Sequence, residues 1–406
     1  MLNTEYDNVI SWLFQQFPSY QKIGQKAYKP NLDNINNLVQ QLSIPFHQLN
    51  YIHVAGTNGK GTTCSILAST LKEAGYNVGL YTSPHIVDFR ERIRINGNKI
   101  EESDVIKFVE KTRKTKLSFS PSFFEITWAM ALDHFIKEKC DIVIVETGLG
   151  GRLDATNIID PILSVITSIG LDHTDILGET RSQIAKEKCG IIKKKKPIIS
   201  GFLDPEIKPI FINQSTISNS LLIEVDTRQA RSYFDKNQLI VEKTLEILNK
   251  NTLFNSSASH LELGIKNIYQ NSGYRGRLQK IHDSPTIILD GAHNKEGVIA
   301  LLDSIDKLYQ YNNLHIIYGA SNDKNIEEII DLFPSVCNTY FVSFNHPRSA
   351  TIERYQPILS QKNKKFQFHP NALNLLSNLK STVNKNDMVL IFGSFFLLED
   401  FLKKMD

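Results

Sequence analysis

The sequence predicts an α/β protein with two domains, each built on a mostly parallel sheet flanked by helices. The chain has 406 residues, which is too many for one ordinary core. Short apolar runs rich in Val and Ile alternate with segments of helical periodicity, and this alternation occurs in two separate series. A stretch of poor periodicity, residues 203–284, lies between the two series.

The first series contains five expected strands, each bounded by Gly, Pro or Asp. Because these runs are apolar on both faces, they are typical of a parallel sheet that helices cover on both sides. Between them, residues 62–75 place apolar side chains on one side of a helix that ends at Gly75, and residues 123–139 predict a second helix. The expected strands are 51–56, 78–82, 141–147, 162–168 and 197–202.

The second series begins after residue 285 and repeats the same alternation. Its expected strands are TIILDG, LHIIYGAS, NTYFVSF and DMVLIFGS, each followed by a helix. The segment NSGYRGR, residues 271–277, is the best linker because two glycines and a serine flank its only aromatic residue. We therefore expect an N-terminal domain over residues 1–273 and a smaller C-terminal domain over residues 274–406.

Composition and charge exclude several classes of protein. Hydrophobic residues make up 41% and charged residues 22%, as in a globular protein. The net charge of +3 is too small to indicate a nucleic-acid partner. Four widely spaced cysteines indicate reduced thiols, and no apolar run has the length of a membrane span. We expect a cytoplasmic protein that binds neither nucleic acid nor membrane.

The stretch HVAGTNGKGTT, residues 53–63, lies between an expected strand and an expected helix. Its three glycines let backbone N–H groups approach an anion, Lys60 adds a full charge, and the helix adds the positive end of its dipole. A tight turn without a ligand is the alternative. The spacing departs from the GxxxxGK[ST] pattern, and the hydroxyl arrives one residue late, at Thr62. The pattern predicts a phosphate loop whose metal ligand comes from elsewhere.

Three other expected strands end in residues that can bind a cation. Ser83 follows the second strand in TSPH, Glu146 follows the third in VETG, and LDHTD supplies Asp172, His173 and Asp175 after the fourth. Ligands of open α/β sheets collect at such strand ends. Ser83 and Glu146 offer the oxygen atoms that Mg²⁺ prefers. Read alone, a histidine between two aspartates in a loop, as His173 is, is more often a surface residue that hydrogen-bonds its neighbours.

Five motifs together resemble the folylpolyglutamate synthase and dihydrofolate synthase family, within the Mur ligase superfamily. They are HVAGTNGKGTT, TSPHIVDFRERIRING, VETGLGGRLDATNII, LDHTDILG with IAKEKCGIIK, and ILDGAHN, in the family's order. The resemblance covers nearly the whole chain and is weakest over residues 203–270. It implies a P-loop ATPase-like N-terminal domain that binds ATP, and a Rossmann-like C-terminal domain that acts as the glutamate-ligase part.

The resemblance also implies roles for residues of the first domain. Ser83 and Glu146 would hold one Mg²⁺ and His173 a second, so that Ser83 supplies the hydroxyl that does not follow Lys60. Lys188 matches a lysine that family members carry as a carbamate, although an ordinary ion-paired helix lysine is the alternative. Lys60, Lys188 and His173 would be the catalytic residues. The residues implied to hold the ATP phosphates are Asn58, Gly59, Lys60, Gly61 and Thr62.

The remaining implied residues concern the nucleotide, the pterin ring and glutamate. In the second domain, Arg277 resembles a residue that reaches the ATP phosphates and Asp290 one that contacts the nucleoside. His293 and Ser394 lie where glutamate recognition is expected. For all four residues of the second domain, roles in turns and helix caps are the alternative. Asp290, for example, could cap the helix that starts near His293. At the pterin end, the resemblance implies that the ring of Phe124 stacks on the substrate and that Asp154 binds its amino groups; a core role for this aromatic residue is the alternative.

The activity implied is the ATP-dependent joining of L-glutamate to dihydropteroate or a folate through an acyl phosphate, by a monomer with two Mg²⁺ sites. One alternative is a Mur-type ligase that adds amino acids to a peptidoglycan precursor. A nucleotide-binding protein without catalytic activity is another. The sequence leaves open whether the enzyme makes dihydrofolate, extends polyglutamate tails, or does both.

Overall fold

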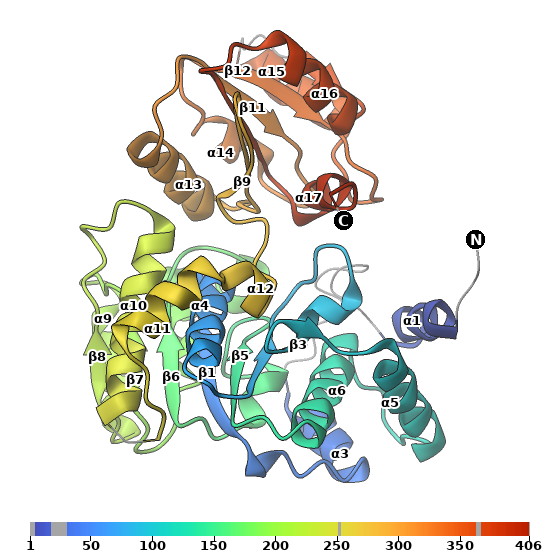
Figure 1. Cartoon of the computed structure of the whole chain (residues 1–406), viewed down its shortest axis with the longest axis vertical. Coiled ribbons are helices and arrows are strands. Elements are labelled where there is room, and N and C mark those ends of the chain that lie inside the picture. Colours follow the sequence, from blue (N-terminus) through green and yellow to red (C-terminus); the bar gives the residue numbers. More distant parts are fainter. Residues whose placement is uncertain (1–4, 18–30, 251–252, 363–366, 406) are drawn as a thin grey trace. The chain divides into compact units, whose positions relative to one another are not determined.

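The computed structural model describes residues 5–17, 31–250, 253–362 and 367–405 (Figure 1). The chain divides into two compact units, each with its own sheet. The first unit comprises Met1–Gln229 and Phe234–Tyr274, and the second comprises Ala230–Tyr233 and Arg275–Asp406. The four-residue segment Ala230–Tyr233 is a difference from the single boundary expected from the sequence.

The first unit contains an eight-stranded sheet in the order β4-β3-β2-β5-β1-β6-β7-β8. The predicted fold class is confirmed, because the five expected strands all form and pair in parallel. A short antiparallel pair, β3 and β4, extends one edge, and β8 lies parallel to β7 at the other. The strands are β1 (Asn50–Ala55), β2 (Val78–Tyr81), β3 (Ile93–Ile95), β4 (Asn98–Lys99), β5 (Ile142–Glu146), β6 (Leu163–Ile166), β7 (Ile198–Ser200) and β8 (Leu222–Glu224).

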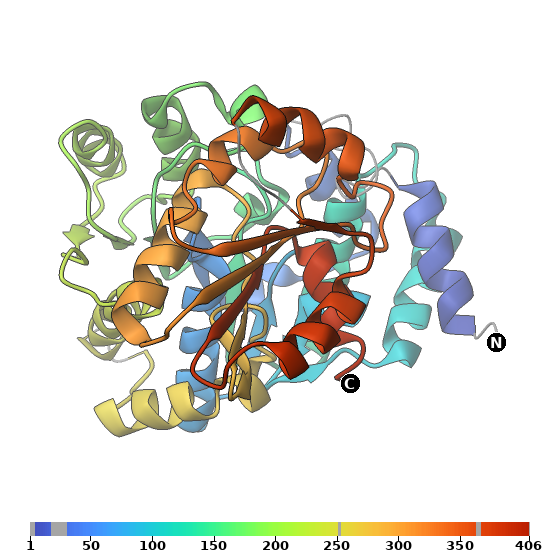
Figure 2. The same ribbon diagram turned by 90° about the horizontal axis from the view of Figure 1, so that it is seen from above.

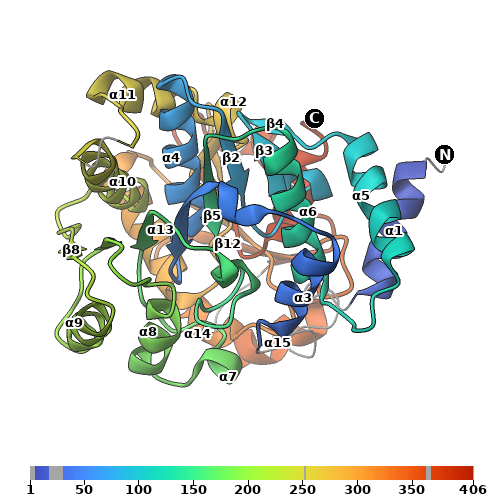
Figure 3. The ribbon, with the colours of Figure 1, turned by 90° about the horizontal axis from the view of Figure 1, so that it is seen from below.

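Helices cover both faces of this sheet, as the apolar strands predict. Val143 and Val145 of β5 join a cluster with α6 on one face, whereas Ile142 and Ile144 join a cluster with α4 on the other. Figure 3 shows α4 and α6 on opposite sides of β2 and β5. The helices are α1 (Glu5–Gln16), α3 (Asp33–Gln41), α4 (Lys60–Glu73), α5 (Glu102–Thr115), α6 (Phe123–Lys137), α7 (Thr174–Leu177), α8 (Arg181–Cys189) and α9 (Lys208–Ile217), with the 3₁₀ turns η2 (Phe46–Gln48), η3 (Phe89–Arg92) and η4 (Ala155–Ile158).

The poorly periodic stretch between the two series is largely helical. It contains α10 (Tyr233–Lys250), α11 (Ala258–Lys266) and α12 (Ile268–Ser272). Both α11 and α12 pack against α4. At the crossing, a Cβ placed on Gly264 would lie 2.8 Å from the backbone of Thr70, so the two helices approach too closely for any larger residue. The helix α4 is therefore buried from Thr62 to Leu71, so that its polar side is covered as well as the apolar side that the sequence predicts.

The second unit contains a six-stranded sheet in the order β13-β12-β11-β14-β10-β9, parallel except for β9 at one edge. Seen from above, α13 and the C-terminal helix α17 lie on opposite sides of its strands (Figure 2). The strands are β9 (Gln279–Asp283), β10 (Thr286–Leu289), β11 (Leu314–Tyr318), β12 (Asn338–Val342), β13 (Gln367–His369) and β14 (Met388–Phe392), and the helices are α13 (Lys295–Leu308), α14 (Ile326–Ile330), α15 (Ile352–Gln361), α16 (Ala372–Thr382) and α17 (Phe395–Leu402).

Strand order fixes where a ligand can bind in the first sheet. The chain moves from β1 to β2 on one side of β1, and later from β6 to β8 on the other side. A crevice opens outside the carboxyl ends of parallel strands where the order reverses in this way.

Among the helices of the described residues, none combines the length and the apolar composition needed to cross a bilayer.

Candidate functional site

The glycine-rich segment connects β1 to the first turn of α4, as the sequence predicts. Gly59 adopts a left-handed conformation, with φ +90°, and caps the helix, so that Lys60 is the first helical residue. The Nζ atom of Lys60 donates to the carbonyl oxygens of Gly56, at 2.9 Å, and Thr57, at 3.1 Å. The lysine thus folds back over the loop. The first N–H groups of the fourteen-residue helix α4 and this ammonium group are donors of the kind that can bind an anion.

Residues after β6 hold the loop in this shape. The N–H of Asn58 donates to Ser168 Oγ at 3.0 Å, and the carbonyl of Asn58 accepts bonds from Thr167 Oγ1 at 2.6 Å and Ser168 Oγ at 2.9 Å. A Cβ on Gly56 would lie 1.9 Å from Thr167 Oγ1, and the φ of Gly56 is +150°. This position therefore requires glycine, for both space and conformation.

Two residues from the poorly periodic stretch also contact the loop. Asn237 of α10 accepts a hydrogen bond from Thr63 Oγ1 at 3.2 Å, and its amide would meet a Cβ on Gly59 at 2.3 Å. Tyr274, after α12, places its hydroxyl 3.3 Å from Thr62 Oγ1. Sequence reasoning missed both residues, because no local pattern links them to a loop about 200 positions away.

The ends of β2 and β5 bring Ser83 and Glu146 together beside the loop. The N–H of Ser83 donates to Glu146 Oε2 at 3.0 Å. A Cβ on Gly61 would lie 3.6 Å from the same oxygen, so the carboxylate borders the start of α4. A hydroxyl and a carboxylate next to a phosphate site fit a Mg²⁺ ion, which binds few protein oxygens and keeps several waters.

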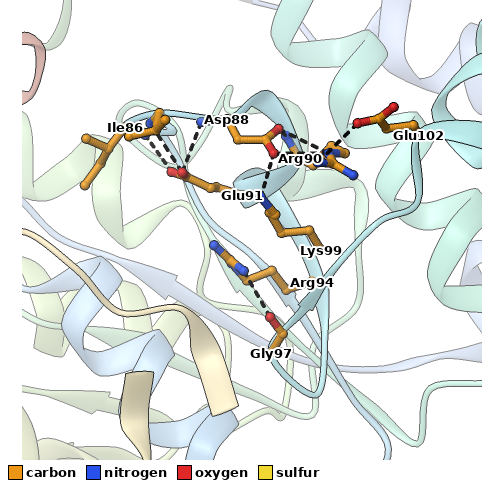
Figure 4. A network of polar contacts seen from close by, with 9 residues as sticks. Ile86, Asp88, Arg90, Glu91, Arg94, Gly97, Lys99 and Glu102 are labelled. Carbon is orange, nitrogen blue, oxygen red and sulfur yellow. Dashed lines mark hydrogen bonds and ion pairs between the residues drawn. The ribbon is translucent and has the colours of Figure 1, made fainter. Parts of the chain in front are cut away.

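The loop that carries Ser83 is held by two carboxylates (Figure 4). Glu91 accepts backbone N–H bonds from Ile86 at 2.7 Å, Val87 at 3.3 Å and Asp88 at 3.0 Å. Asp88 in turn accepts bonds from Arg90 at 2.9 Å and Lys99 at 2.6 Å. Burial opposes ionisation of Asp88, but these two cations outweigh it and lower its pKa to about 2. The hydrogen bonds to these two carboxylates therefore hold the segment after β2 in one conformation.

Lys188 of α8 reaches the phosphate loop from within the core. It is 4% exposed, and its Nζ donates to the carbonyl of Gly56 at 3.0 Å, the same oxygen that Lys60 contacts. Burial, and then the charge of Lys60, lower the pKa of Lys188 to about 7, against the opposing effect of Asp172 and Asp154. A large fraction of this lysine is therefore uncharged near neutral pH. Its neighbour Cys189 is also buried, with a pKa raised to about 12, which fits a packing role.

His173 lies at the start of α7 in a left-handed conformation, with φ +50°. Its backbone N–H donates to Asp172 Oδ1 at 2.9 Å. In the part of the chain that the structure describes, no three His, Cys, Asp or Glu side chains gather closely enough to hold a metal ion. The structure thus brings Ser83 and Glu146 to the loop, whereas His173 contacts the aspartate that precedes it.

The two residues expected at the pterin end meet at the segment after β5. The ring of Phe124, near the start of α6, lies so close to Gly148 that a Cβ there would be 2.5 Å from its Cζ. Asp154 accepts the N–H of Leu149 at 2.8 Å. An aromatic face and a carboxylate thus flank one short piece of backbone. Ser122 caps α6 and forms a capping box with Glu125.

In the second unit, Asp290 is a buried carboxylate with several donors. It accepts bonds from the N–H groups of Ala292 and Leu278, both at 2.8 Å, and from the hydroxyl of Tyr233. Burial raises its pKa, while Arg277 opposes this effect. The alternative in which Asp290 caps the next helix is wrong, because Asn294 caps α13.

The other three residues expected in this unit lie near Phe395 at the start of α17. The guanidinium carbon of Arg277 is 4.6 Å from the centre of the Phe395 ring. The ring of His293 is 5.9 Å from the same ring, and its Nδ1 lies 2.9 Å from the carbonyl oxygen of Gly291. Ser394 caps α17 by accepting the N–H of Phe396 at 3.2 Å. The helix-cap alternative for Ser394 is thus observed.

Comparison with known proteins first defines a class. Residues 54–267 match the Mur ligase middle domain, and residues 276–395 match the glutamate ligase domain of Mur ligases. A phosphate loop opening α4, with Ser83 and Glu146 beside it, agrees with this match. The chain belongs to the Mur ligase superfamily by its fold and by the matched domains.

Its nearer relatives define the family. The chain is 34% identical to the dihydrofolate synthase/folylpolyglutamate synthase of Buchnera aphidicola subsp. Schizaphis graminum, over 97% of each chain. It is similar to the structure of E. coli FolC in complex with DHPP and ADP, with 29% identity, a TM-score of 0.83, and 98% of this chain and 97% of that chain covered. A bifunctional folylpolyglutamate synthase/dihydrofolate synthase with Mn, AMPPNP and L-glutamate bound matches with 26% identity, a TM-score of 0.83, and 98% of each chain covered. The chain belongs to the dihydrofolate synthase/folylpolyglutamate synthase family.

Proposed function

We propose that this protein joins L-glutamate to the carboxylate of dihydropteroate or of a reduced folate, at the expense of ATP. The observation that carries the proposal is the meeting of Lys60, Ser83 and Glu146 at one phosphate loop. Membership of the family supports the folate reaction over the peptidoglycan alternative, since the relatives above are named for folate substrates. The four thiols are unpaired, which supports a cytoplasmic location.

The reaction would proceed in two displacements. A carboxylate oxygen of the pteroate or folate attacks the γ-phosphorus of ATP, ADP leaves, and an acyl phosphate forms. The amine of glutamate then attacks the acyl carbon, phosphate leaves, and the amine loses a proton to give an amide. The first step is needed because a carboxylate is a poor electrophile.

The chain's own residues would act mainly by charge and position. The N–H groups from Asn58 to Thr62 and the ammonium of Lys60 would hold the phosphates and stabilise charge on the transferred group. Ser83 and Glu146 would hold a Mg²⁺ ion, which when bound reduces the repulsion between the two anionic reactants. A second ion held by His173 is a further part of the proposal, as is action as a monomer.

Lys188 would carry a carbamate. The uncharged amine adds CO₂, an N–C bond forms, and one proton is lost, so that an anion replaces a cation. The low pKa of about 7 supports this, because only the uncharged amine reacts. The change would also replace the repulsion between the charges of Lys188 and Lys60 by an attraction.

Roles at the other ends of the substrates complete the proposal. Phe124 would stack on the pterin ring, and Asp154 would accept hydrogen bonds from the amino groups of that ring. In the second unit, Arg277 and Asp290 would contact the nucleotide, and His293 and Ser394 would recognise glutamate. Their positions at strand and helix ends support these roles.

The decisive test is an assay of glutamate incorporation, run with dihydropteroate and separately with a reduced folate monoglutamate. We expect ATP- and glutamate-dependent product with at least one of them. Lys60→Ala and Glu146→Ala should each lower kcat by about 100-fold or more, because each removes a charge that acts on the transferred group. Unchanged circular dichroism would show that the fold is intact. Phosphate release with a UDP-muramoyl peptide but with neither pterin substrate would overturn the proposal.

A further inference from the structure

A chain of hydrogen bonds reaches Asp154 from the interior of the first sheet. Thr156 Oγ1 donates to Asp154 Oδ1 at 2.5 Å, and the N–H of Thr156 donates to the same oxygen at 3.0 Å. His53 Nε2 lies 2.8 Å from Thr156 Oγ1. His53 and Thr156 are fully buried, and Asp154 is 4% exposed. His53 is in β1, so a core strand is linked to the carboxylate through Thr156.

The hydrogen atoms in this chain can be assigned from its geometry. The hydroxyl of Thr156 has one hydrogen, which Asp154 receives because a carboxylate only accepts. The hydroxyl must therefore accept from His53, and the imidazole carries its proton on Nε2. The Nδ1 atom of His53 has no hydrogen-bond partner within the described residues. A second proton there would place an unpaired cation in the core, and burial accordingly lowers the pKa of His53 to about 3. The bonds therefore point one way, from His53 through Thr156 to Asp154.

This arrangement holds both oxygens of Asp154. Oδ1 has two lone pairs, and both are taken by Thr156. Oδ2 accepts the N–H of Leu149, which directly follows the glycine beneath the Phe124 ring. The N–H of Gly148 also bonds to this carboxylate, so its other donors come from the backbone beside the Phe124 ring. A flat heterocycle with amino groups, stacked on Phe124, would have the carboxylate at its edge.

We propose that Thr156, oriented by His53, is a positioning residue that fixes the orientation of the Asp154 carboxylate toward the amino groups of the pterin ring. This inference rests on the proposed function. It adds two residues to the site. The pair acts through Asp154 and does not itself touch the substrate.

The competing role is purely local. Asp154 also caps the turn η4 through the N–H of Thr156, so the hydroxyl could serve only to stabilise that turn. A local role predicts that its removal lowers the thermal stability and leaves the substrate constants unchanged. A positioning role predicts a change confined to the pterin substrate.

The test is steady-state kinetics of Thr156→Val and Thr156→Ser, with dihydropteroate or the folate that the wild type accepts. Valine has the shape of threonine without the hydroxyl, and it leaves the cap N–H in place. We expect Thr156→Val to raise KM for the pterin substrate about tenfold or more, the effect of losing one hydrogen bond to a charged group. KM for ATP and for glutamate should stay within about twofold, the scatter expected for distant sites. Thr156→Ser, which keeps the hydroxyl, should restore the wild-type KM.

Two further variants keep the inference open to refutation. Thr244→Val removes another fully buried hydroxyl of the same unit, one that bonds within α10, and should leave all three KM values unchanged. If Thr156→Val does not fold, Thr156→Ala replaces it, and binding of the pterin substrate is measured directly by fluorescence. We again expect binding about tenfold weaker, the effect of losing about one hydrogen bond. An unchanged pterin KM, or an equal rise in all three, overturns the inference. A wild type that incorporates no glutamate overturns the proposed function instead, so the two failures are distinguishable.

Discussion

The buried ammonium of Lys188 makes a quantitative prediction about stability and pH. Its pKa falls from 10.5 to about 7 on folding. Between these values the unfolded chain binds more protons than the folded chain, so the free energy of unfolding must rise with pH. Each pKa unit is worth about 1.4 kcal/mol. From about pH 6 to about pH 9, this residue alone should stabilise the fold by about 2 to 3 kcal/mol.

The assay compares wild type with Lys188→Met by urea unfolding at both pH values, in buffer freed of CO₂ so that no carbamate forms. The methionine removes one bond to the Gly56 carbonyl, which keeps its bond from Lys60. The rise in the free energy of unfolding with pH should be smaller in Lys188→Met by about 2 to 3 kcal/mol. The control is Lys194→Met, which removes the same charge from an exposed residue and should keep the wild-type slope. Equal slopes for wild type and Lys188→Met would refute the reasoning.

Three other predictions concern the loop, the second unit and the carbamate. Gly56→Ala should be destabilised more than Gly75→Ala by about 1 to 3 kcal/mol in thermal unfolding, because both have positive φ but only the first side chain would clash. Tyr233→Phe should lower the free energy of unfolding by about 1 to 3 kcal/mol, since it removes a hydrogen-bond donor from the buried carboxylate of Asp290. After CO₂ removal, added bicarbonate should restore activity better at about pH 8 than at about pH 6, because only the uncharged amine of Lys188 reacts.

Each of these three has its own control. Equal melting temperatures for Gly56→Ala and Gly75→Ala would show that the loop yields to a methyl group. Tyr309→Phe removes a half-buried hydroxyl that is not bonded to Asp290 and should leave the stability unchanged; an equal loss there would argue against a specific role of Tyr233. For the carbamate, native mass spectrometry should show the added mass of one CO₂ in wild type, and its persistence in Lys188→Met would place the adduct elsewhere.

The fold was predictable where the sequence pattern is local. The five strands of the first sheet are apolar on both faces, and the phosphate loop joins a strand to a helix, so both could be located without knowing their neighbours. The burial of α4 could not be predicted from a local pattern. Its polar face contains Ser69, which donates to the carbonyl of Gly264 at 2.6 Å, and that partner lies 195 positions away. A serine on a helix predicts exposure unless the partner is known.

The site divides in the same way. Ser83, Glu146 and Lys60 could be found because strand ends and glycine loops carry recognisable residues. Asn237 and Tyr274 reach the loop only through the packing of α10 and α12, and nothing near them in sequence points there. One usable signal was present for His53, since an imidazole inside a strand that is apolar on both faces requires a buried partner.

The passage of the chain between the units limits how the protein can be divided. The segment Ala230–Tyr233 belongs to the second unit, although 229 residues of the first precede it. Its last residue donates its hydroxyl to Asp290 and its N–H to Ser304 Oγ at 3.1 Å. A gene fragment starting at Arg275 would encode every strand of the second sheet yet lack both donors. Chimaeras between relatives that exchange this unit at a single splice point would therefore inherit a mismatched tetrapeptide, and a faithful exchange requires two additional splice sites.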